Sequence, residues 1–316
     1  MIPNQFHLIW IGRQFPFVYR LAVESLVQTQ SHSKIVVHFQ DPPQGNQDWD
    51  ALQKKVEFRP IDMTQLLAGL PPSIAATASV LEKISSAYPA GKSNVLRYLI
   101  LYREGGIYLD FDTITLNSFA ALLENHAFVG EEKVFRCDDD RVAGKWTWSY
   151  PFYGALFGLS YGLSYTNCRW LGGIKLIETM NAGLMHAWSA NKLNNAVLGA
   201  EPKNPFFAQA LELIPSTNAS MRFALGPMLM NRTYSETNPD SIRRLPPPYF
   251  YAIPPSQTFR FFFGSPMKLP EEAIVLHWCS SNHRSLAPSL TRKALESAAS
   301  PHLYGQLARK ILEKGI

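Results

Sequence analysis

Short apolar runs alternate with amphipathic segments over the first hundred residues of the chain. Residues 6–12 and 34–39 are apolar runs closed by a glycine and by an Asp-Pro-Pro turn, so each predicts a buried strand. Residues 17–30 between them carry apolar side chains at helical spacing, and residues 56–61 indicate a third strand. This alternation predicts a mainly parallel α/β sheet of the nucleotide-binding kind.

A helix is predicted over residues 91–104, with Ser93 as its N-cap and Gly105-Gly106 as its stop. Residues 107–113 then indicate a strand that runs into a loop. Further strands are expected over residues 127–132, 193–200 and 273–278, and further helices over residues 205–214 and 291–314. Residues 133–173 are rich in aromatic side chains and show no clean period, so no element is predicted there.

Composition places the chain among globular proteins. It has 316 residues, of which 46% are hydrophobic and 17% charged, and no linker separates two domains. No apolar run reaches the ~18 residues of a membrane-spanning helix. The first residues lack a basic segment and a small-residue cleavage site, which argues against a secretory signal.

Charge and cysteine content narrow the partners. The formal net charge of +5 and the pI near 9.0 favour anionic ligands such as nucleotide phosphates or a lipid surface. No block of Lys and Arg accompanies this excess, so we expect no nucleic-acid partner. Cys137, Cys168 and Cys279 form no CxxC pair, which argues against a zinc site or a disulfide framework and fits a reducing compartment.

The sharpest chemical pattern is Asp110-x-Asp112 at the end of a predicted strand. Two carboxylates at this spacing share one face of a strand, and where the strand opens into a loop both reach one cation. Hard oxygen ligands suit Mg²⁺ or Mn²⁺, which in turn neutralises a nucleotide diphosphate. A solvated turn is the alternative for an isolated motif of this length.

The helix before this motif carries Asn94 and Arg97 three residues apart, on one face. An arginine there can bind a phosphate or a carboxylate through two parallel hydrogen bonds. The structural alternative for Arg97 is a salt bridge with Glu104 or with an acidic residue of the following loop.

Residues 93–112, SNVLRYLILYREGGIYLDFD, resemble the DXD sugar-binding region of retaining GT-A-type glycosyltransferases. That group includes fungal initiating mannosyltransferases, bacterial capsule-type transferases and, more distantly, the clostridial glucosylating toxins. Four shorter segments resemble other family motifs: Ile2-Pro3 with His7-x-x-Trp10-x-Gly12, residues 194–200 with Asn204-Pro205-Phe206, Gly226-Pro227, and His277-Trp278. The resemblance spans residues 2–283, except for a region at about 133–190.

The resemblance implies roles for particular residues. Asp112 would ligate the metal, Asp110 would contact the ribose or donor sugar and help to hold the metal, and His277 is a candidate third ligand. The residues implied on the donor side are Trp10, which would stack on the base, Asn94, Arg97, Tyr108, Asn195 and Ser281, with Asn282 as an alternative to Ser281. The family usually has Asp where this chain has Asn94, so the donor sugar stays open.

The implied fold is one GT-A-like, Rossmann-type nucleotide-sugar-binding unit with a mixed, mostly parallel sheet and extra helices. It would occupy residues 1–290, with residues 133–190 as an acceptor-side insertion and residues 291–316 as a basic C-terminal helix. The implied activity is that of a retaining, Mn²⁺- or Mg²⁺-dependent hexosyltransferase of the kind found in polysaccharide biosynthesis. Its donor would be a nucleotide-diphosphate sugar, UDP in preference to GDP, and its acceptor a saccharide or glycolipid.

Three alternatives stay in view. A toxin-like transferase would glycosylate a protein side chain, and a non-catalytic sugar-binding module would not need Asp110, Asp112 and Arg97 together. A phosphohydrolase of the haloacid-dehalogenase type shares the strand and DxD pattern, but Ile114 does not match its last position and no later Lys and GDxxxD motif follows.

The aromatic stretch at residues 146–170 is expected to be mainly core, with an acceptor cleft as the alternative. We expect a cytoplasmic protein, in peripheral contact with the inner membrane face if its basic C-terminal helix binds lipid. A secreted effector is the alternative location.

Overall fold

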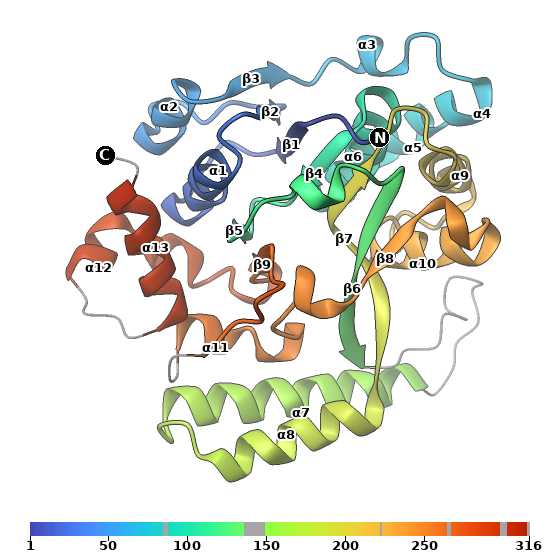
Figure 1. Cartoon of the computed structure of the whole chain (residues 1–316). Helices are drawn as coiled ribbons and strands as arrows, with labels where there is room; N and C mark the ends of the chain where they lie inside the picture. Colours follow the sequence, from blue (N-terminus) through green and yellow to red (C-terminus); the bar gives the residue numbers. More distant parts are fainter. Residues whose placement is uncertain (85–87, 136–148, 222, 264–266, 298–301, 315–316) are drawn as a thin grey trace.

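The computed structural model describes residues 1–84, 88–135, 149–221, 223–263, 267–297 and 302–314. A seven-stranded sheet with the order β3-β2-β1-β4-β7-β6-β8 runs through its centre (Figure 1). These strands are β1 (Gln5–Trp10), β2 (Lys34–Phe39), β3 (Glu57–Pro60), β4 (Gly106–Leu109), β6 (Ala127–Phe135), β7 (Ser189–Ala200) and β8 (Arg243–Leu245). Strands β1 to β4 are mutually parallel, β7 is antiparallel to both of its neighbours, and β8 is parallel to β6. The predicted α/β class with a mixed, mostly parallel sheet is therefore confirmed.

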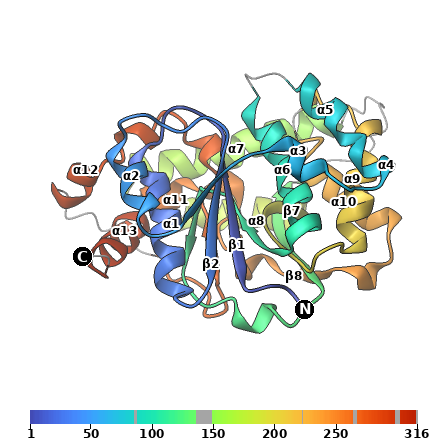
Figure 2. The ribbon, with the colours of Figure 1, turned by 90° about the horizontal axis from the view of Figure 1, so that it is seen from above.

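Helices cover both faces of this sheet. The α-helices of the described residues, not all of which lie on the sheet, are α1 (Phe17–Thr29), α2 (Gln47–Gln53), α3 (Met63–Leu67), α4 (Pro72–Ala75), α5 (Thr77–Lys83), α6 (Pro89–Glu104), α7 (Ser149–Arg169), α8 (Lys175–Trp188), α9 (Pro205–Leu213), α10 (Pro227–Glu236), α11 (Phe259–Phe262), α12 (Arg292–Ser297) and α13 (Leu303–Lys314). Figure 2 shows α1 and α2 on one side of β1 and β2, and α6, α9 and α10 on the other.

The alternation of side chains along β4 explains this layering. Ile107 and Leu109 pack with residues of α1 and α2, whereas Tyr108 packs with residues of α6, α9 and α10. Both faces of the central strands are thus buried, as expected for parallel strands with helices on each side. The exposed ends of the strands are then the places where polar side chains can gather.

The predicted elements of the first half agree with the structure to within a few residues, but Ser93 is not an N-cap. Helix α6 begins at Pro89, because proline needs no backbone donor in the first turn. The helix ends at Gly105, whose φ of 67° favours glycine. Ser93 therefore lies inside the helix, where its side chain faces the site described below.

Two further predictions need correction. The expected C-terminal helix over residues 291–314 is split into α12 and α13, with residues 298–301 outside the described part. The aperiodic stretch contains helix α7, which pairs with α8 in a hairpin at the lower edge of Figure 1. Asp138, Trp146 and Trp148 lie outside the described residues. Among the described residues, no helix is both long and apolar enough to cross a bilayer.

A second, two-stranded sheet joins distant parts of the chain. Strand β5 (Thr113–Thr115) pairs antiparallel with β9 (Val275–His277), so that Thr113 lies opposite His277. The N–H of Trp278 also donates to the carbonyl of Asp112 at 3.0 Å. This pairing brings the residues after β9 beside the turn that follows β4.

Candidate active site

The Asp110–Asp112 turn lies at the carboxyl end of β4, between the two sheets. The backbone N–H of Asp110 donates to the carbonyl of Ala196 at 2.8 Å, which fixes the start of the turn against β7. The hydroxyl of Thr113 donates to the carbonyl of Asp110 at 2.7 Å and closes the turn. Ligands of open α/β sheets bind at this end of the strands, so the motif has the position that its chemistry requires.

Arg97 of α6 holds the carboxylate of Asp110. Its Nη2 lies 2.9 Å from Oδ1 and its Nη1 donates to Oδ2 at 3.2 Å, while Nη1 also donates to the carbonyl of Asn195 at 2.5 Å. The hydroxyl of Tyr108 donates to the same Oδ1 at 2.6 Å, and the Arg97 guanidinium lies over the Tyr108 ring. The acidic partner of Arg97 is therefore Asp110 in the loop, since Glu104 pairs with Arg59 instead.

Ser93 completes this arrangement from one turn earlier on α6. Its hydroxyl accepts a hydrogen bond from Nη2 of Arg97 at 3.2 Å and lies 3.3 Å from the hydroxyl of Tyr108. The guanidinium is thus almost fully buried and bonded on several sides. Asp110 keeps an accessible edge, because 27% of its side chain is exposed.

Asp112 faces the imidazole of His277. The Oδ1 of Asp112 lies 3.3 Å from Nε2 of His277, and its Oδ2 accepts the backbone N–H of Ser280 at 2.7 Å. Ser280 begins the short helix η7 (Ser280–Asn282) directly after β9. Ser281, the residue implied by the resemblance, is exposed on that helix, and the side chain of Asn282 donates to the carbonyl of Pro255.

Burial and charge act in opposite directions on the two aspartates. Burial raises the pKa of Asp110, and the neighbouring Asp112 carboxylate raises it further against the effect of Arg97. Burial would also raise the pKa of Asp112, but His277 and the hydrogen bonds from Ser280 hold it well below its usual value. Burial opposes the charge on His277, yet Cys279 and Asp112 raise its pKa well above the usual value. Without a metal the pair is therefore a carboxylate–imidazolium ion pair, and a divalent cation that binds His277 must displace the proton from its imidazole.

The ligand atoms of Asp110, Asp112 and His277 lie within 4.8 Å of one another. Two carboxylates and one imidazole form a donor set that suits Mg²⁺ or Mn²⁺, with open positions left for a diphosphate. The residues present therefore fit the cation that the DXD motif implies. The sequence resemblance named these three residues, and the structure brings them together.

Behind His277 lies a buried carboxylate that the sequence analysis missed. Oε1 of Glu132 in β6 is 4.0 Å from Nδ1 of His277, and Sγ of Cys279 lies 3.5 Å from the same nitrogen. The side chain of Asn194 donates to Oε2 of Glu132 at 2.6 Å and fixes its orientation. Cys279 has a φ of 52°, which is unusual for a residue other than glycine and turns its side chain back towards His277. The sequence feature that could have indicated this buried carboxylate is a glutamate within the apolar strand predicted at residues 127–132.

Asn94 and Asn195 lie together on the other side of Arg97. The side chain of Asn195 donates both to Oδ1 of Asn94 and to the hydroxyl of Tyr98, each at 2.9 Å. A Cβ on Gly226 would lie 3.1 Å from the Asn94 side-chain nitrogen, so the Gly226-Pro227 motif borders this cluster. Three segments that resemble the family thus converge on one group of polar side chains.

Trp10 lies at the carboxyl end of β1, on the same edge of the sheet as Asp110. Its ring packs edge-on against Phe15 and Phe111, and its Nε1 donates to the carbonyl of Gly12 at 3.0 Å. A hollow of about 370 Å³ is lined by residues 13–16 after β1 and 44–46 after β2, together with Pro288; Trp10 does not line it but packs against Phe15, which does. The indole is half-buried, so one part of it remains accessible.

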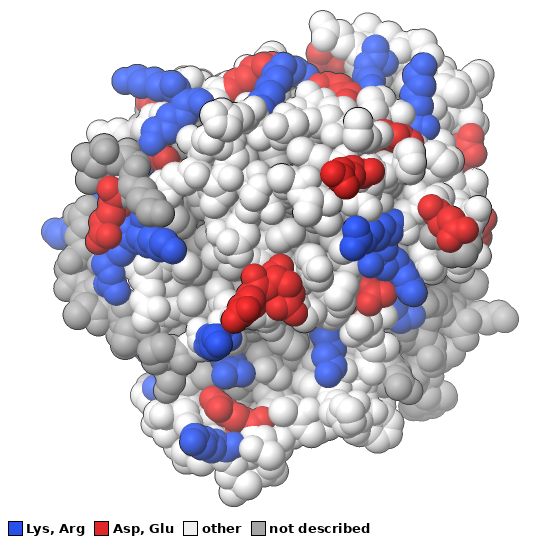
Figure 3. Space-filling model, in the orientation of Figure 1, with Lys and Arg blue, Asp and Glu red and all other residues white. Residues whose placement is uncertain are grey.

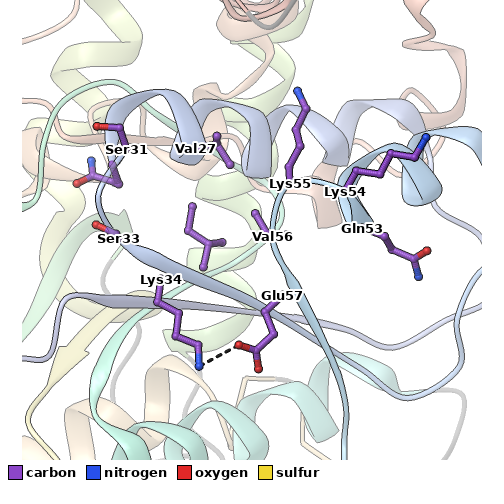
Figure 4. Close-up of a pocket in the computed structure, with 11 residues that line it drawn as sticks. Val27, Ser31, Ser33, Lys34, Gln53, Lys54, Lys55, Val56 and Glu57 are labelled. Carbon is purple, nitrogen blue, oxygen red and sulfur yellow. Dashed lines mark ion pairs between the residues drawn. The ribbon is translucent and has the colours of Figure 1, made fainter.

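A second hollow, of about 460 Å³, lies at the opposite edge of the sheet (Figure 4). It is lined by the segments that precede β2 and β3, where Lys34 pairs with Glu57 at 2.9 Å. These segments lie at the amino ends of the strands, whereas the Asp110–Asp112 turn lies at the carboxyl ends. This hollow therefore takes no part in the site.

Comparison with known proteins agrees with this position of the site. Residues 16–129 match the family model described as "Glycosyltransferase sugar-binding region containing DXD motif". The matched segment contains α6, β4 and the Asp110–Asp112 turn, whereas Asn195 and His277 lie outside it. No curated protein matches the chain.

Solved structures that resemble the chain include three glycosyltransferases. The PaToxG glycosyltransferase is 16% identical over 75% of this chain and 70% of its own, with a TM-score of 0.41. The UDP-bound glycosyltransferase domain of the YGT toxin is 10% identical over 77% of this chain and 79% of its own, with a TM-score of 0.41. The galactosyltransferase LgtC, in complex with donor and acceptor sugar analogues, is 13% identical over 91% of this chain and 96% of its own, with a TM-score of 0.41. These are distant similarities.

Proposed function

We propose that the chain is a metal-dependent glycosyltransferase that moves a hexose from a nucleotide-diphosphate sugar, UDP in preference to GDP, with retention of configuration. The observation that carries this proposal is the convergence of Asp110, Asp112 and His277, with Arg97 bonded behind them. The family match over residues 16–129 supports the same reaction class.

The donor would lie along the carboxyl edge of the sheet, from Trp10 to the Asp110–Asp112 turn. The base would stack on the partly exposed ring of Trp10, because every base presents a π-face to an aromatic side chain. The exposed edge of Asp110 would bond a ribose or sugar hydroxyl. Asn94 and Asn195 would approach the hexose, because they present both donors and acceptors from one buried cluster.

A bound Mn²⁺ or Mg²⁺ would neutralise the diphosphate as it leaves. Asp112 and His277 would be its principal protein ligands, joined by Asp110. Arg97 would act by fixing Asp110 and the carbonyl of Asn195, because its donors are already engaged by these groups. A preorganised site of this kind stabilises charge without moving during the reaction.

The bonding of the carboxylates favours direct attack by the acceptor on the same face as the departing phosphate. Asp110 accepts hydrogen bonds from both Arg97 and Tyr108, and Glu132 is held by Asn194. Hydrogen bonds from cationic and hydroxyl donors lower the nucleophilicity of a carboxylate, and these bonds hold both side chains in place. Retention without a covalent intermediate is therefore the simpler pathway.

For the acceptor we propose a saccharide or glycolipid, bound on the side of residues 133–190. Helix α7 reaches the site from that region, because the hydroxyl of Tyr161 donates to the carbonyl of Asn282 at 3.2 Å. The expectation that this aromatic stretch is mainly core is wrong for the side chains of Phe152, Tyr165 and Trp170, which are exposed. Trp170 is the most exposed of the three, at 72%.

The proposal is tested by thermal unfolding of the protein with a panel of nucleotide sugars, with and without Mn²⁺. A ligand at about 100 times its dissociation constant adds about 2.7 kcal/mol, enough to identify the donor. Asp112→Asn should stay folded without ligand, with some loss of stability because its charge no longer pairs with His277, and should lose the Mn²⁺-dependent shift and sugar transfer. If no nucleotide sugar shifts the wild type in Mn²⁺, the proposal is wrong. Proton NMR of the first hydrolysis product reports whether the anomeric configuration is retained.

A further inference from the structure

Exposed apolar side chains are concentrated on the α7–α8 hairpin. Of the eleven large apolar residues that are exposed in the described part of the chain, nine lie between residues 152 and 188. The most exposed of these are Trp170 (72%), Leu176 (68%), Met180 (59%) and Leu159 (53%). Figure 3 shows white surface along much of the lower edge of the molecule, where the hairpin lies, with red and blue groups gathered at its left end. A patch of this kind marks a contact surface rather than ordinary solvent-facing helices.

The interior of the hairpin is polar. Ser160, Ser164 and Asn167 on α7 and Asn181 on α8 are all buried. The hydroxyl of Ser160 donates to Oδ1 of Asn181 at 2.7 Å, and Nδ2 of Asn181 donates to the hydroxyl of Ser164 at 2.8 Å. Helix pairs in water normally bury apolar side chains and expose polar ones. Polar side chains that join two helices whose apolar side chains face outward are typical of helices in contact with lipid.

Positive charge surrounds the tip of the hairpin. Arg169 and Lys175 are exposed on either side of the turn that carries Trp170, Leu171 and Ile174. Glu178 is the acidic residue within α8, and its Oε1 lies 3.8 Å from Nη2 of Arg260. Apolar side chains flanked by cations suit a surface that has an apolar interior and anionic headgroups.

We propose that the outer face of the α7–α8 hairpin docks on an anionic phospholipid bilayer. Trp170, Leu176 and Met180 would enter the headgroup region, and Arg169 and Lys175 would contact lipid phosphates. Tryptophan is favoured at this depth because its ring is apolar and its N–H is polar. The docking would be peripheral, since neither helix is apolar enough to span the membrane.

A second copy of the chain fits this surface less well. A twofold contact between tips would bring Arg169 and Lys175 of both copies together, and like charges at short distance disfavour association. A bilayer supplies the opposite charge instead. The surface is also linked to the site, because Tyr161 of α7 bonds the η7 helix that carries Ser280. Docking therefore brings the acceptor side close to lipid, although vesicle binding itself does not depend on the proposed transfer reaction.

The test is flotation of the full chain with phosphatidylcholine vesicles, with and without phosphatidylglycerol. The wild type should float with the anionic vesicles, and high salt should weaken the binding. The double variant Leu176→Ser, Met180→Ser should need at least about tenfold more lipid for half of the protein to bind, because two apolar side chains no longer enter the headgroup region. Lys175→Gln should weaken binding only to the anionic vesicles.

Phe223→Ser is the matched control, because Phe223 is also exposed and apolar (46%) but lies outside the hairpin. It should bind vesicles as the wild type does. Thermal unfolding establishes that each variant is folded. A wild type that stays with the unbound fraction in anionic vesicles overturns the proposal, as does a double variant that floats equally well. A dimer in sedimentation velocity that the double variant dissociates would assign the surface to a second copy instead.

Discussion

Nε2 of His277 lies 3.3 Å from Oδ1 of Asp112, although the two residues belong to distant segments of the chain. The contact exists because β5 and β9 pair with Thr113 opposite His277. The Asp110–Asp112 turn after β4 therefore supplies only one half of the candidate metal site, and the strand that ends at His277 supplies the other half. The matched region at residues 16–129 contains the first half alone.

Replacement of Arg97 by lysine should reduce kcat/KM for transfer about 100-fold. Lysine keeps the charge but loses the planar fork that bonds Asp110 and the carbonyl of Asn195 together. Arg103→Lys on the same helix is the matched control, because Arg103 is exposed and donates to the carbonyl of Ala68. Steady-state kinetics of both variants decide the matter, and equal activity of Arg97→Lys and Arg103→Lys would refute the positioning role of Arg97.

The strands up to β4 and the helices α1 and α6 follow from local pattern, because apolar runs and glycine stops act within a few residues. Helices α2 to α5, between residues 47 and 83, were not predicted, because each is too short to show an apolar period. Asp110, Asp112 and Arg97 were predictable for the same reason, since they lie within one short motif. Glu132 and Ser280 were not, because their approach to His277 and Asp112 depends on how β6 and β9 pack. A sequence pattern carries no information on contacts of that kind.

Helix α7 shows a different limit. Its buried positions are Ser160, Ser164 and Asn167, whereas apolar residues such as Leu159 face outward. The buried face of this helix is therefore polar, so the apolar residues do not mark the side that faces the protein and the segment shows no apolar period.

The free energy of unfolding should fall as the pH drops from 7 to 5. Burial lowers the pKa of His7 to about 4 and that of His283 to about 4, so each is neutral in the folded protein over this range. The unfolded chain binds protons near pH 6.5, so the folded state loses stability as the pH falls from about 6.5 towards 4. The loss between pH 7 and pH 5 should be about 2 kcal/mol for each histidine.

Urea unfolding at the two pH values measures this loss. His283→Gln should remove the part of this loss of unfolding free energy that comes from His283, because glutamine does not titrate. Glutamine can still bond the hydroxyl of Thr258, which lies 2.8 Å from Nε2 of His283. His186→Gln, at an exposed position, should leave the pH dependence as it is in the wild type. A wild type with the same unfolding free energy at both pH values would contradict the expectation.

Gly106→Ala should destabilise the fold by about 2–5 kcal/mol. Gly106 begins β4 with a φ of 95°, and a Cβ there would lie 2.6 Å from the backbone carbonyl of Gln5 in β1. Gly158→Ala is the contrasting variant, because a Cβ at that helical position meets nothing within 4 Å. It should be neutral or stabilising by up to about 1 kcal/mol. Urea midpoints of the two variants should therefore move in opposite directions or by very different amounts.

Glu132→Gln should weaken Mn²⁺ binding about 10- to 100-fold, as loss of a carboxylate behind a metal-binding histidine does elsewhere. Oε1 of Glu132 faces Nδ1 of His277 at 4.0 Å, on the side of the ring away from Asp112. The carboxylate favours a proton on Nδ1 and thereby leaves Nε2 free for the cation. Glutamine keeps the shape of the side chain and its bond with Asn194, but it removes the charge that orients the ring.

Glu131→Gln provides the matched control for this variant, since Glu131 is the adjacent residue of β6 and points to Arg244, 3.3 Å away. Its Mn²⁺ affinity should equal that of the wild type. Titration calorimetry with Mn²⁺ alone measures both affinities without any donor or acceptor, so the outcome does not depend on the reaction. Thermal unfolding in chelator separates lost affinity from lost structure: Glu132→Gln should melt near the wild type there. Equal Mn²⁺ affinity of Glu132→Gln and Glu131→Gln would show that the buried carboxylate does not position His277, and the proton on Nδ1 would then have to be held by the Cys279 sulfur, 3.5 Å away.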